Sequence, residues 1–112
     1  MATYMTQFSY TAEAWATLAQ HPQDRSQVLS ALLDQLGGHL ICLYYSFGAY
    51  DGVALFEVPD DVTAATVLIA AMVPGHLKST STTKLLSVGE ALQAMEHAGQ
   101  LSYPGPSTGA HV

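Results

Sequence analysis

Histidine is the side chain of this sequence best suited to proton transfer near neutral pH, and the chain has five, at His21, His39, His76, His97 and His111. No two of them have the His-x-His or His-x-x-x-His spacing that is typical of a metal site. His39 and Cys42 share an expected strand, where a three-residue offset turns two side chains to opposite faces. The sequence therefore predicts no metal site and no cofactor. It leaves His39 and His76 as candidate general bases, or as the axial ligand of a haem-binding variant.

A phenol and a carboxylate stand side by side at Tyr50 and Asp51, within the segment Gly48-Ala49-Tyr50-Asp51-Gly52. Beside a pocket mouth the pair would bind a ligand or transfer a proton, which makes Asp51 a third candidate base. Alternatively the segment is a hairpin turn, in which Asp51 accepts hydrogen bonds from backbone amides and Tyr50 anchors the turn on the core. The residue types alone leave both interpretations open.

Hydroxyl groups on the expected strands and turn supply the candidate ligand-binding residues, which are Tyr45, Tyr50, Thr80 and Thr82. Tyr44 and Tyr45 are adjacent on a strand, so we expect one to pack on the helices and the other to face the space between two paired sheets. Along the segment 78–84, one face carries Lys78, Thr80, Thr82 and Lys84. That face either lines a polar pocket or forms a hydrated sheet edge.

The elements that must position these residues alternate between strands and helices. Apolar patterning and turn signals predict strands over 3–9, 39–47, 53–58 and 76–86. Caps and helical spacing predict a first helix that breaks at Pro22 and resumes to residue 36, a second from Asp61 to Pro74, and a short third over 87–97. The order βαββαβ is the ferredoxin-like α+β arrangement, with a four-stranded antiparallel sheet and helices on one face.

The second expected strand indicates that the sheet is covered on both sides. Residues 40–45 are apolar or aromatic without interruption, whereas a strand with one face in water alternates. The helices account for one face only. A second copy of the same sheet would cover the other, so the sequence predicts a homodimer joined through the sheet face.

Charge and length narrow the class of protein. The 112 residues suit one domain, over 1–98, followed by an irregular tail over 99–112 that is rich in Pro and Gly. Three Lys and Arg against nine Asp and Glu give a net charge of −6, which disfavours nucleic acid and anionic membranes as partners. We see no leader and no apolar run near the ~20 residues of a membrane span, so we expect a cytoplasmic protein.

The segments Gly48-Ala49-Tyr50-Asp51 and Val58-Pro59-Asp60-Asp61 resemble the pattern of GYD domain proteins. Gly37-Gly38 after the first helix and the Thr-rich fourth strand agree with that pattern, from about residue 3 to about residue 95. Gly52 departs from it, because a larger apolar residue is more usual there. The resemblance implies a dimeric α+β barrel. It implies no single activity, since the wider group includes cofactor-free monooxygenases, haem enzymes, isomerases and ligand-sensing modules.

Three functions stay open on this basis. The first is a small-molecule-binding or regulatory protein, whose dimer encloses an apolar cavity with a few hydroxyls. The second is a cofactor-independent monooxygenase- or isomerase-type enzyme, with His39, His76 or Asp51 as its base. The third is an oligomer-forming structural protein.

Overall fold

The computed structural model describes residues 1–107. Its elements run in the order β1 (Ala2–Tyr10), α1 (Ala12–Gln20), α2 (Arg25–Gln35), β2 (His39–Tyr45), β3 (Gly52–Val58), α3 (Asp61–Met72), β4 (Leu77–Leu85) and α4 (Val88–Gly99). The predicted order of strands and helices is confirmed. The break at Pro22 separates α1 from α2, and α4 is as long as α3 rather than short. His111 lies outside the described residues.

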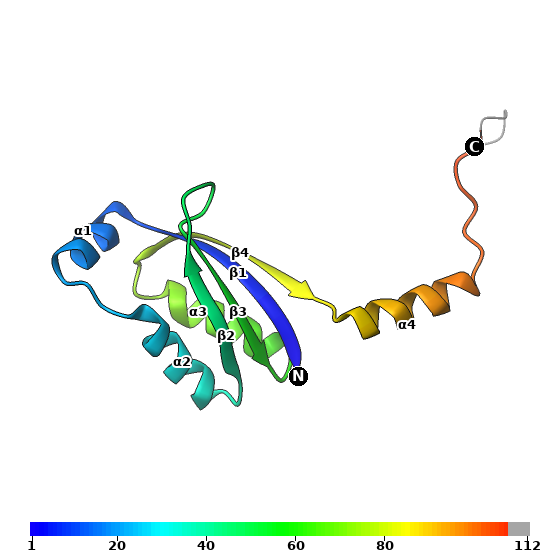
Figure 1. Ribbon diagram of the computed structural model, residues 1–112, viewed down its shortest axis with the longest axis horizontal. Coiled ribbons are helices and arrows are strands. Elements are labelled where there is room, and N and C mark those ends of the chain that lie inside the picture. Colours follow the sequence, from blue (N-terminus) through cyan, green and yellow to red (C-terminus); the bar gives the residue numbers. More distant parts are fainter. Residues whose placement is uncertain (108–112) are drawn as a thin grey trace.

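The four strands form one antiparallel sheet in the order β2-β3-β1-β4 (Figure 1). The predicted hairpin joins β2 to β3, although β2 ends at Tyr45 rather than at Phe47. Ser46 already belongs to the turn, where its amide donates to the carbonyl of Asp51 over 2.8 Å. The ferredoxin-like fold class is therefore confirmed for the single chain.

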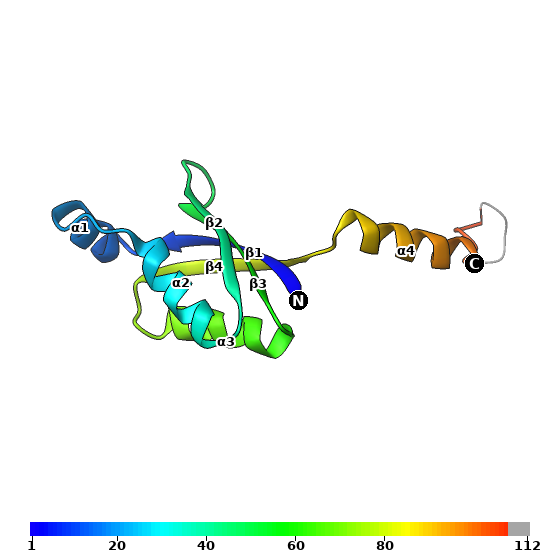
Figure 2. The same cartoon turned by 60° about the horizontal axis from the view of Figure 1, so that its bottom comes forward.

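Helices α2 and α3 cover one face of the sheet, and α1 lies at its end (Figure 2). Along β1 and β3 every second side chain is buried on that face, which is the alternation expected of a sheet with one covered side. The core beneath the two helices consists of Tyr4, Leu33, Phe56, Val58, Ala64 and Val67.

The surroundings of Gly52 explain why this position has no larger apolar residue. A Cβ atom built on it would lie 2.4 Å from the ring of Phe8, so the phenyl group occupies the space that a side chain would need. A second close approach occurs at Gly38, whose Cβ would lie 2.3 Å from the carbonyl oxygen of Glu57. Gly52 leaves room for the Phe8 ring of the adjacent strand, and Gly38 lets the chain that follows α2 approach the backbone of β3.

The strand pairing is irregular at two places, where the simple alternation of side chains is interrupted. The register of β2 against β3 shifts between Leu40 and Cys42, and that of β1 against β4 shifts between Ser9 and Tyr10. Each shift inserts an irregularity that redirects the side chains beyond it.

The opposite face of the sheet has no helix on it in the part of the chain that the structure describes (Figures 1 and 2). Helix α4 does not cover it, because it continues away from the end of β4. The molecule therefore measures 64 × 33 × 22 Å with a radius of gyration of 19.1 Å, against about 13 Å for a compact domain of ~100 residues. The apolar residues Val88, Leu92 and Met95 of α4 are exposed.

Candidate functional site

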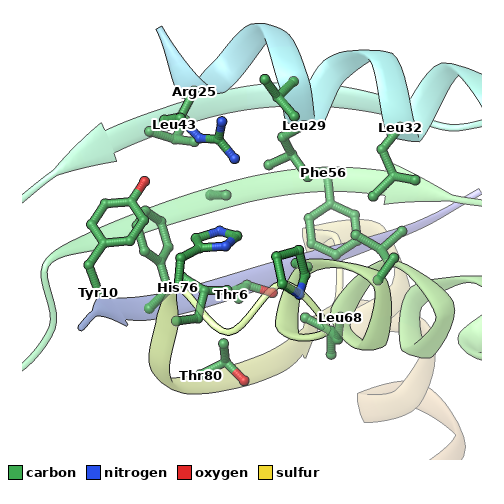
Figure 3. A pocket seen from close by; sticks show the side chains of 18 residues that line it. Thr6, Tyr10, Arg25, Leu29, Leu32, Leu43, Phe56, Leu68, His76 and Thr80 are labelled. Carbon is green, nitrogen blue, oxygen red and sulfur yellow. The ribbon is translucent and has the colours of Figure 1, made fainter. Parts of the chain in front are cut away.

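A cavity of about 180 Å³ lies between the sheet and the helices α2 and α3 (Figure 3). Its walls are mainly apolar. The sheet contributes Phe8, Leu43, Ala54 and Phe56, and the helices contribute Leu29, Leu32, Val67 and Leu68. The cavity exists because these side chains cover the sheet without filling the space near the ends of the strands.

Five polar side chains also line the cavity, namely Thr6, Tyr10, Arg25, His76 and Thr80. Tyr10 ends β1 and is buried, with its hydroxyl 3.2 Å from that of Tyr45. His76 follows Gly75, whose φ of +82° turns the chain from α3 into β4. The carbonyl of His76 accepts a hydrogen bond from the Thr11 amide over 3.0 Å, and this bond fixes His76 beside the end of β1.

A second hollow, of about 220 Å³, adjoins the cavity on the side of α1. It is lined by Ala14, Thr17, Leu18 and Gln23, together with three residues that also line the cavity: Tyr10, Arg25 and His76. These three polar residues therefore lie where the two spaces meet. We call them the polar threshold.

The charge states of the polar threshold follow from burial. Burial, with a smaller effect from the Arg25 cation, lowers the pKa of His76 below 6.5. Burial and the hydrogen bond with Tyr45 raise the pKa of Tyr10 well above 10.0. At neutral pH the threshold therefore presents one cation, a neutral imidazole and a neutral phenol.

The candidate ligand-binding residues are placed unequally. Thr80 lines the cavity. Tyr45 does not line it, but its hydroxyl is 3.2 Å from that of Tyr10, which does. Thr82 lies behind the cavity wall, with its hydroxyl 2.8 Å from that of Thr6, which lines the cavity. Tyr50 lies in the turn and lines neither space, and its carbonyl accepts from the Ser46 hydroxyl over 2.8 Å. The prediction that Tyr44 and Tyr45 face opposite sides is confirmed by their partners Val53 and Gly52.

The candidate bases are also separated. His76 alone lines the cavity. Asp51 has the role of a turn residue, because its Oδ2 accepts from the Tyr10 amide over 2.9 Å and from the Trp15 indole over 3.1 Å. His39 lies on the other face of the sheet, 2.9 Å from the carboxylate of Glu57.

The expectation that His39 and Cys42 point to opposite faces is wrong. Their partners Glu57 and Leu55 are two residues apart on β3, so both side chains lie on the face without helices. The irregularity at Ile41 restores the phase that a three-residue offset would otherwise lose. Even so, residues 1–107 contain no group of three or more His, Cys, Asp or Glu side chains that could hold a metal ion.

The expected face of alternate residues in β4 also needs a correction. Thr80, Thr82 and Lys84 share one face as expected, and they pair with Phe8, Thr6 and Tyr4. At the register shift, however, Leu77 rather than Lys78 takes the position opposite Tyr10 and lines the cavity. The cavity wall is more apolar there than the sequence suggested.

Size limits what the cavity can hold. Ligand pockets for drug-sized molecules are roughly 300–1,000 Å³, larger than the 180 Å³ found here. A haem is bulkier than most such ligands and does not fit this space. The cavity suits a small molecule with an apolar body.

Sequence reasoning missed Arg25 and Tyr10. Tyr10 falls one residue beyond the expected first strand, and Arg25 precedes the apolar stripe of its helix. One available signal was that Arg25 is among only three basic residues and stands where the broken helix resumes.

None of the described helices combines the length and the apolar character that crossing a bilayer requires.

The comparisons with known proteins agree with this fold. The family model described as GYD domain matches residues 4–95. The crystal structure of MtbAldR matches with a TM-score of 0.54 and 11% identity, over 77% of this chain and 52% of that one. The crystal structure of TTHA0845 from Thermus thermophilus matches with a TM-score of 0.51 and 19% identity, over 79% of this chain and 96% of that one.

These similarities to solved structures concern the fold alone, because their sequence identities are low. The chain spans about half the length of the MtbAldR chain. A search among curated proteins finds no match.

Proposed function

Since this chain belongs to the GYD domain family, and the family model covers the elements that build the cavity, we propose that it is a small-molecule-binding protein whose ligand occupies the space between the sheet, α2 and α3. A regulatory role, in which the bound molecule changes an association with another chain, is compatible with the same site.

The cavity itself carries the proposal. This space measures about 180 Å³, is partly open to solvent, and is lined by side chains of the sheet, α2 and α3. Its walls are mainly apolar, and three of its five polar side chains gather at one end, in the polar threshold, while Thr6 and Thr80 line it elsewhere. An apolar pocket with convergent polar groups is the usual form of a small-molecule site.

We include in the proposal a homodimer joined through the sheet face that lacks helices, here called the uncovered face. It carries the apolar residues Met5, Val53, Leu55 and Leu85, with Tyr44 66% exposed. Apolar patches of this kind mark interaction sites. A second copy is the economical partner, because a two-fold axis buries the same patch twice.

Helix α4 supports the same dimer. Val88, Leu92 and Met95 are spaced as one stripe of a helix, and all three are exposed. Only Leu86 and Ser87 separate α4 from β4, so the stripe stays beside the sheet end. A 12-residue helix is about 18 Å long. It is too short to provide about 800 Å² per partner alone, so it would add to the uncovered face.

A second candidate function rests on His76. Its imidazole lines the cavity, is partly desolvated, and has a ring centroid 6.0 Å from that of Tyr10. A neutral imidazole in such a place is suited to accept a proton from a bound substrate. This favours His76 over His39 and Asp51 as the base of a cofactor-independent oxygenase- or isomerase-type reaction.

Fluorine NMR with 4-fluorotoluene as the probe tests ligand binding. We expect saturable binding to the wild-type protein and at least a tenfold loss in Leu29→Trp, whose indole would fill the cavity. Leu68→Phe provides a milder filling variant in case the first does not fold. Val62→Trp, on the exposed side of α3, is the matched control and should bind as the wild type does.

Unchanged binding in both filling variants would place the probe elsewhere and contradict the proposal. Absence of binding to the wild type would favour the structural, oligomer-forming alternative. The same samples test the second candidate, because His76 should titrate below 6.5 by NMR. Titration at the ordinary value of an imidazole in water would remove the case for a desolvated base.

A further inference from the structure

We infer that the ligand of this cavity is a small carboxylic acid, with its carboxylate bound by Arg25 at the polar threshold and its apolar body held between the sheet and α2. This inference rests on the proposed function and specifies the class of ligand.

Arg25 lines the cavity, and it is the one residue to do so among the three Lys and Arg residues of the chain. Lys84 is engaged elsewhere, with its Nζ 3.1 Å from Asp61, and Lys78 lines neither space. Within residues 1–107, Arg25 forms no ion pair. Its Nη1 donates instead to the neutral amide oxygen of Gln23 over 3.1 Å. An arginine in an acidic chain, half-buried and without a carboxylate partner, has a free charge to offer.

The surroundings of Arg25 define one end of the site. Figure 3 shows Arg25 and His76 approaching each other from opposite walls, with Tyr10 beside them. His76 and Tyr10 are neutral at physiological pH, so neither supplies a competing charge. Both can donate a hydrogen bond, because an imidazole carries one N–H and the Tyr10 hydroxyl can accept from Tyr45 while donating onward.

A carboxylate matches this group of donors better than a phosphate does. The planar guanidinium pairs with two carboxylate oxygens at once, and such bidentate pairs are the strong form of the contact. A phosphate ester would bring nearly twice the charge against a single cation. The amides at the start of α2 give no further help, because Asp24 caps the helix and accepts from the Ser26 amide over 2.9 Å.

The remainder of the cavity sets the body of the ligand. Beyond the threshold the walls are side chains such as Phe8, Leu29, Leu43 and Phe56. They offer apolar contact to a branched or aromatic hydrocarbon group. The polar side chains beyond the threshold are only Thr80 and Thr6, and the Thr6 hydroxyl is already hydrogen-bonded to that of Thr82. The ligand is therefore a compact aliphatic or aromatic acid rather than a sugar acid or a nucleotide.

The test compares 4-fluorobenzoate with 4-fluorotoluene, which share a ring and differ in the carboxylate. We expect the wild type to bind the acid at least tenfold more tightly. Arg25→Gln should abolish this preference while leaving 4-fluorotoluene binding unchanged, and Arg25→Lys should keep part of it. Lys78→Gln removes a base outside the cavity and is the matched control, with no effect on either probe.

The outcomes separate the two proposals. Equal binding of acid and hydrocarbon by the wild type, or a preference that survives in Arg25→Gln, overturns the carboxylate inference and leaves the small-molecule site in place. Failure of both probes to bind the wild type contradicts the proposed function itself.

Discussion

The two faces of the sheet differ in both composition and surroundings. The helix-covered face is mainly apolar, whereas the uncovered face mixes apolar residues such as Met5 and Leu55 with polar residues such as Thr3, Gln7 and Glu57. On the helix-covered face, Tyr4, Phe56 and Val58 are almost fully buried. On the uncovered face, the intervening residues Val53 and Leu55 are only partly buried. Neighbouring residues of the same strand thus differ in exposure because residues 1–107 place helices on one face only. The comparison teaches that the core and the cavity are formed within one chain, while the uncovered face is the surface on which the proposed homodimer depends.

The largest expected effect contrasts neighbouring residues of β3. Phe56→Ala should lower the free energy of unfolding by about 3–5 kcal/mol at any protein concentration, because its partners belong to the same chain. Leu55→Ala should cost less in dilute solution and more as protein concentration rises, because its proposed partner is a second chain. Urea unfolding at several protein concentrations measures both. A concentration-independent loss for Leu55→Ala would mean that the uncovered face stays in water.

A second contrast concerns α4, which lies outside the cavity and the core. Replacing Leu92 and Met95 by Asp should weaken self-association by at least about tenfold, since burying one large apolar side chain is worth about 1.5–3 kcal/mol. Binding of small probes in the cavity should not change. Sedimentation equilibrium measures the association, with Gln93→Asp on the same helix as the control. A monomeric wild type, or an unaffected double variant, would contradict the proposed role of α4.

The sequence predicted the features of the fold that depend on local residue pattern, which are the strands and the starts of the helices. Apolar patterning and turn signals located the four strands, and the caps at Asp60 and Ser87 located the starts of α3 and α4. The resemblance to GYD domain proteins, carried by the turn and the Val-Pro-Asp-Asp segment, placed the hairpin correctly.

The sequence did not predict the polar threshold, for a physical reason. Tyr10, Arg25 and His76 come from three segments that are distant in the chain, and only the packing of α2 and the turn before β4 brings them together. The irregularities at Ile41 and beside Tyr10 depend on cross-strand register, which a single strand does not encode. Thr80 and His76 were identified because each lies on a strand or at its start, where pattern is informative.

The smallest expected effect on stability comes from removing one polar contact on either face of the sheet. On the helix-covered face the Tyr4 hydroxyl donates to Asp61, which also pairs with Lys84 over 3.1 Å. This hydrogen bond raises the pKa of Tyr4 to about 12 and, together with Lys84, lowers the pKa of Asp61 below 3.8. On the uncovered face, the partly exposed His39 has its Nε2 2.9 Å from the Glu57 carboxylate, and the two form an ion pair when the imidazole is protonated.

Opposite signs of pH dependence follow for the two partners of the Tyr4–Asp61 bond. Because the pKa of Asp61 is lowered on folding, its contribution is present above about pH 3.8 and is lost as pH falls through the folded value. Because the pKa of Tyr4 is raised, its contribution is present below pH 10.0 and is lost as pH rises toward about 12.

Tyr4→Phe should therefore lower the urea midpoint at neutral pH and flatten both the acid and the alkaline loss of stability. His39→Gln should change the midpoint little, since exposed ion pairs contribute about 0–1 kcal/mol. Urea unfolding from pH 3 to pH 11 measures these differences. If His39→Gln proved the more damaging change, the ion pair would be buried in the folded protein, and a second chain covering that face would be the reason.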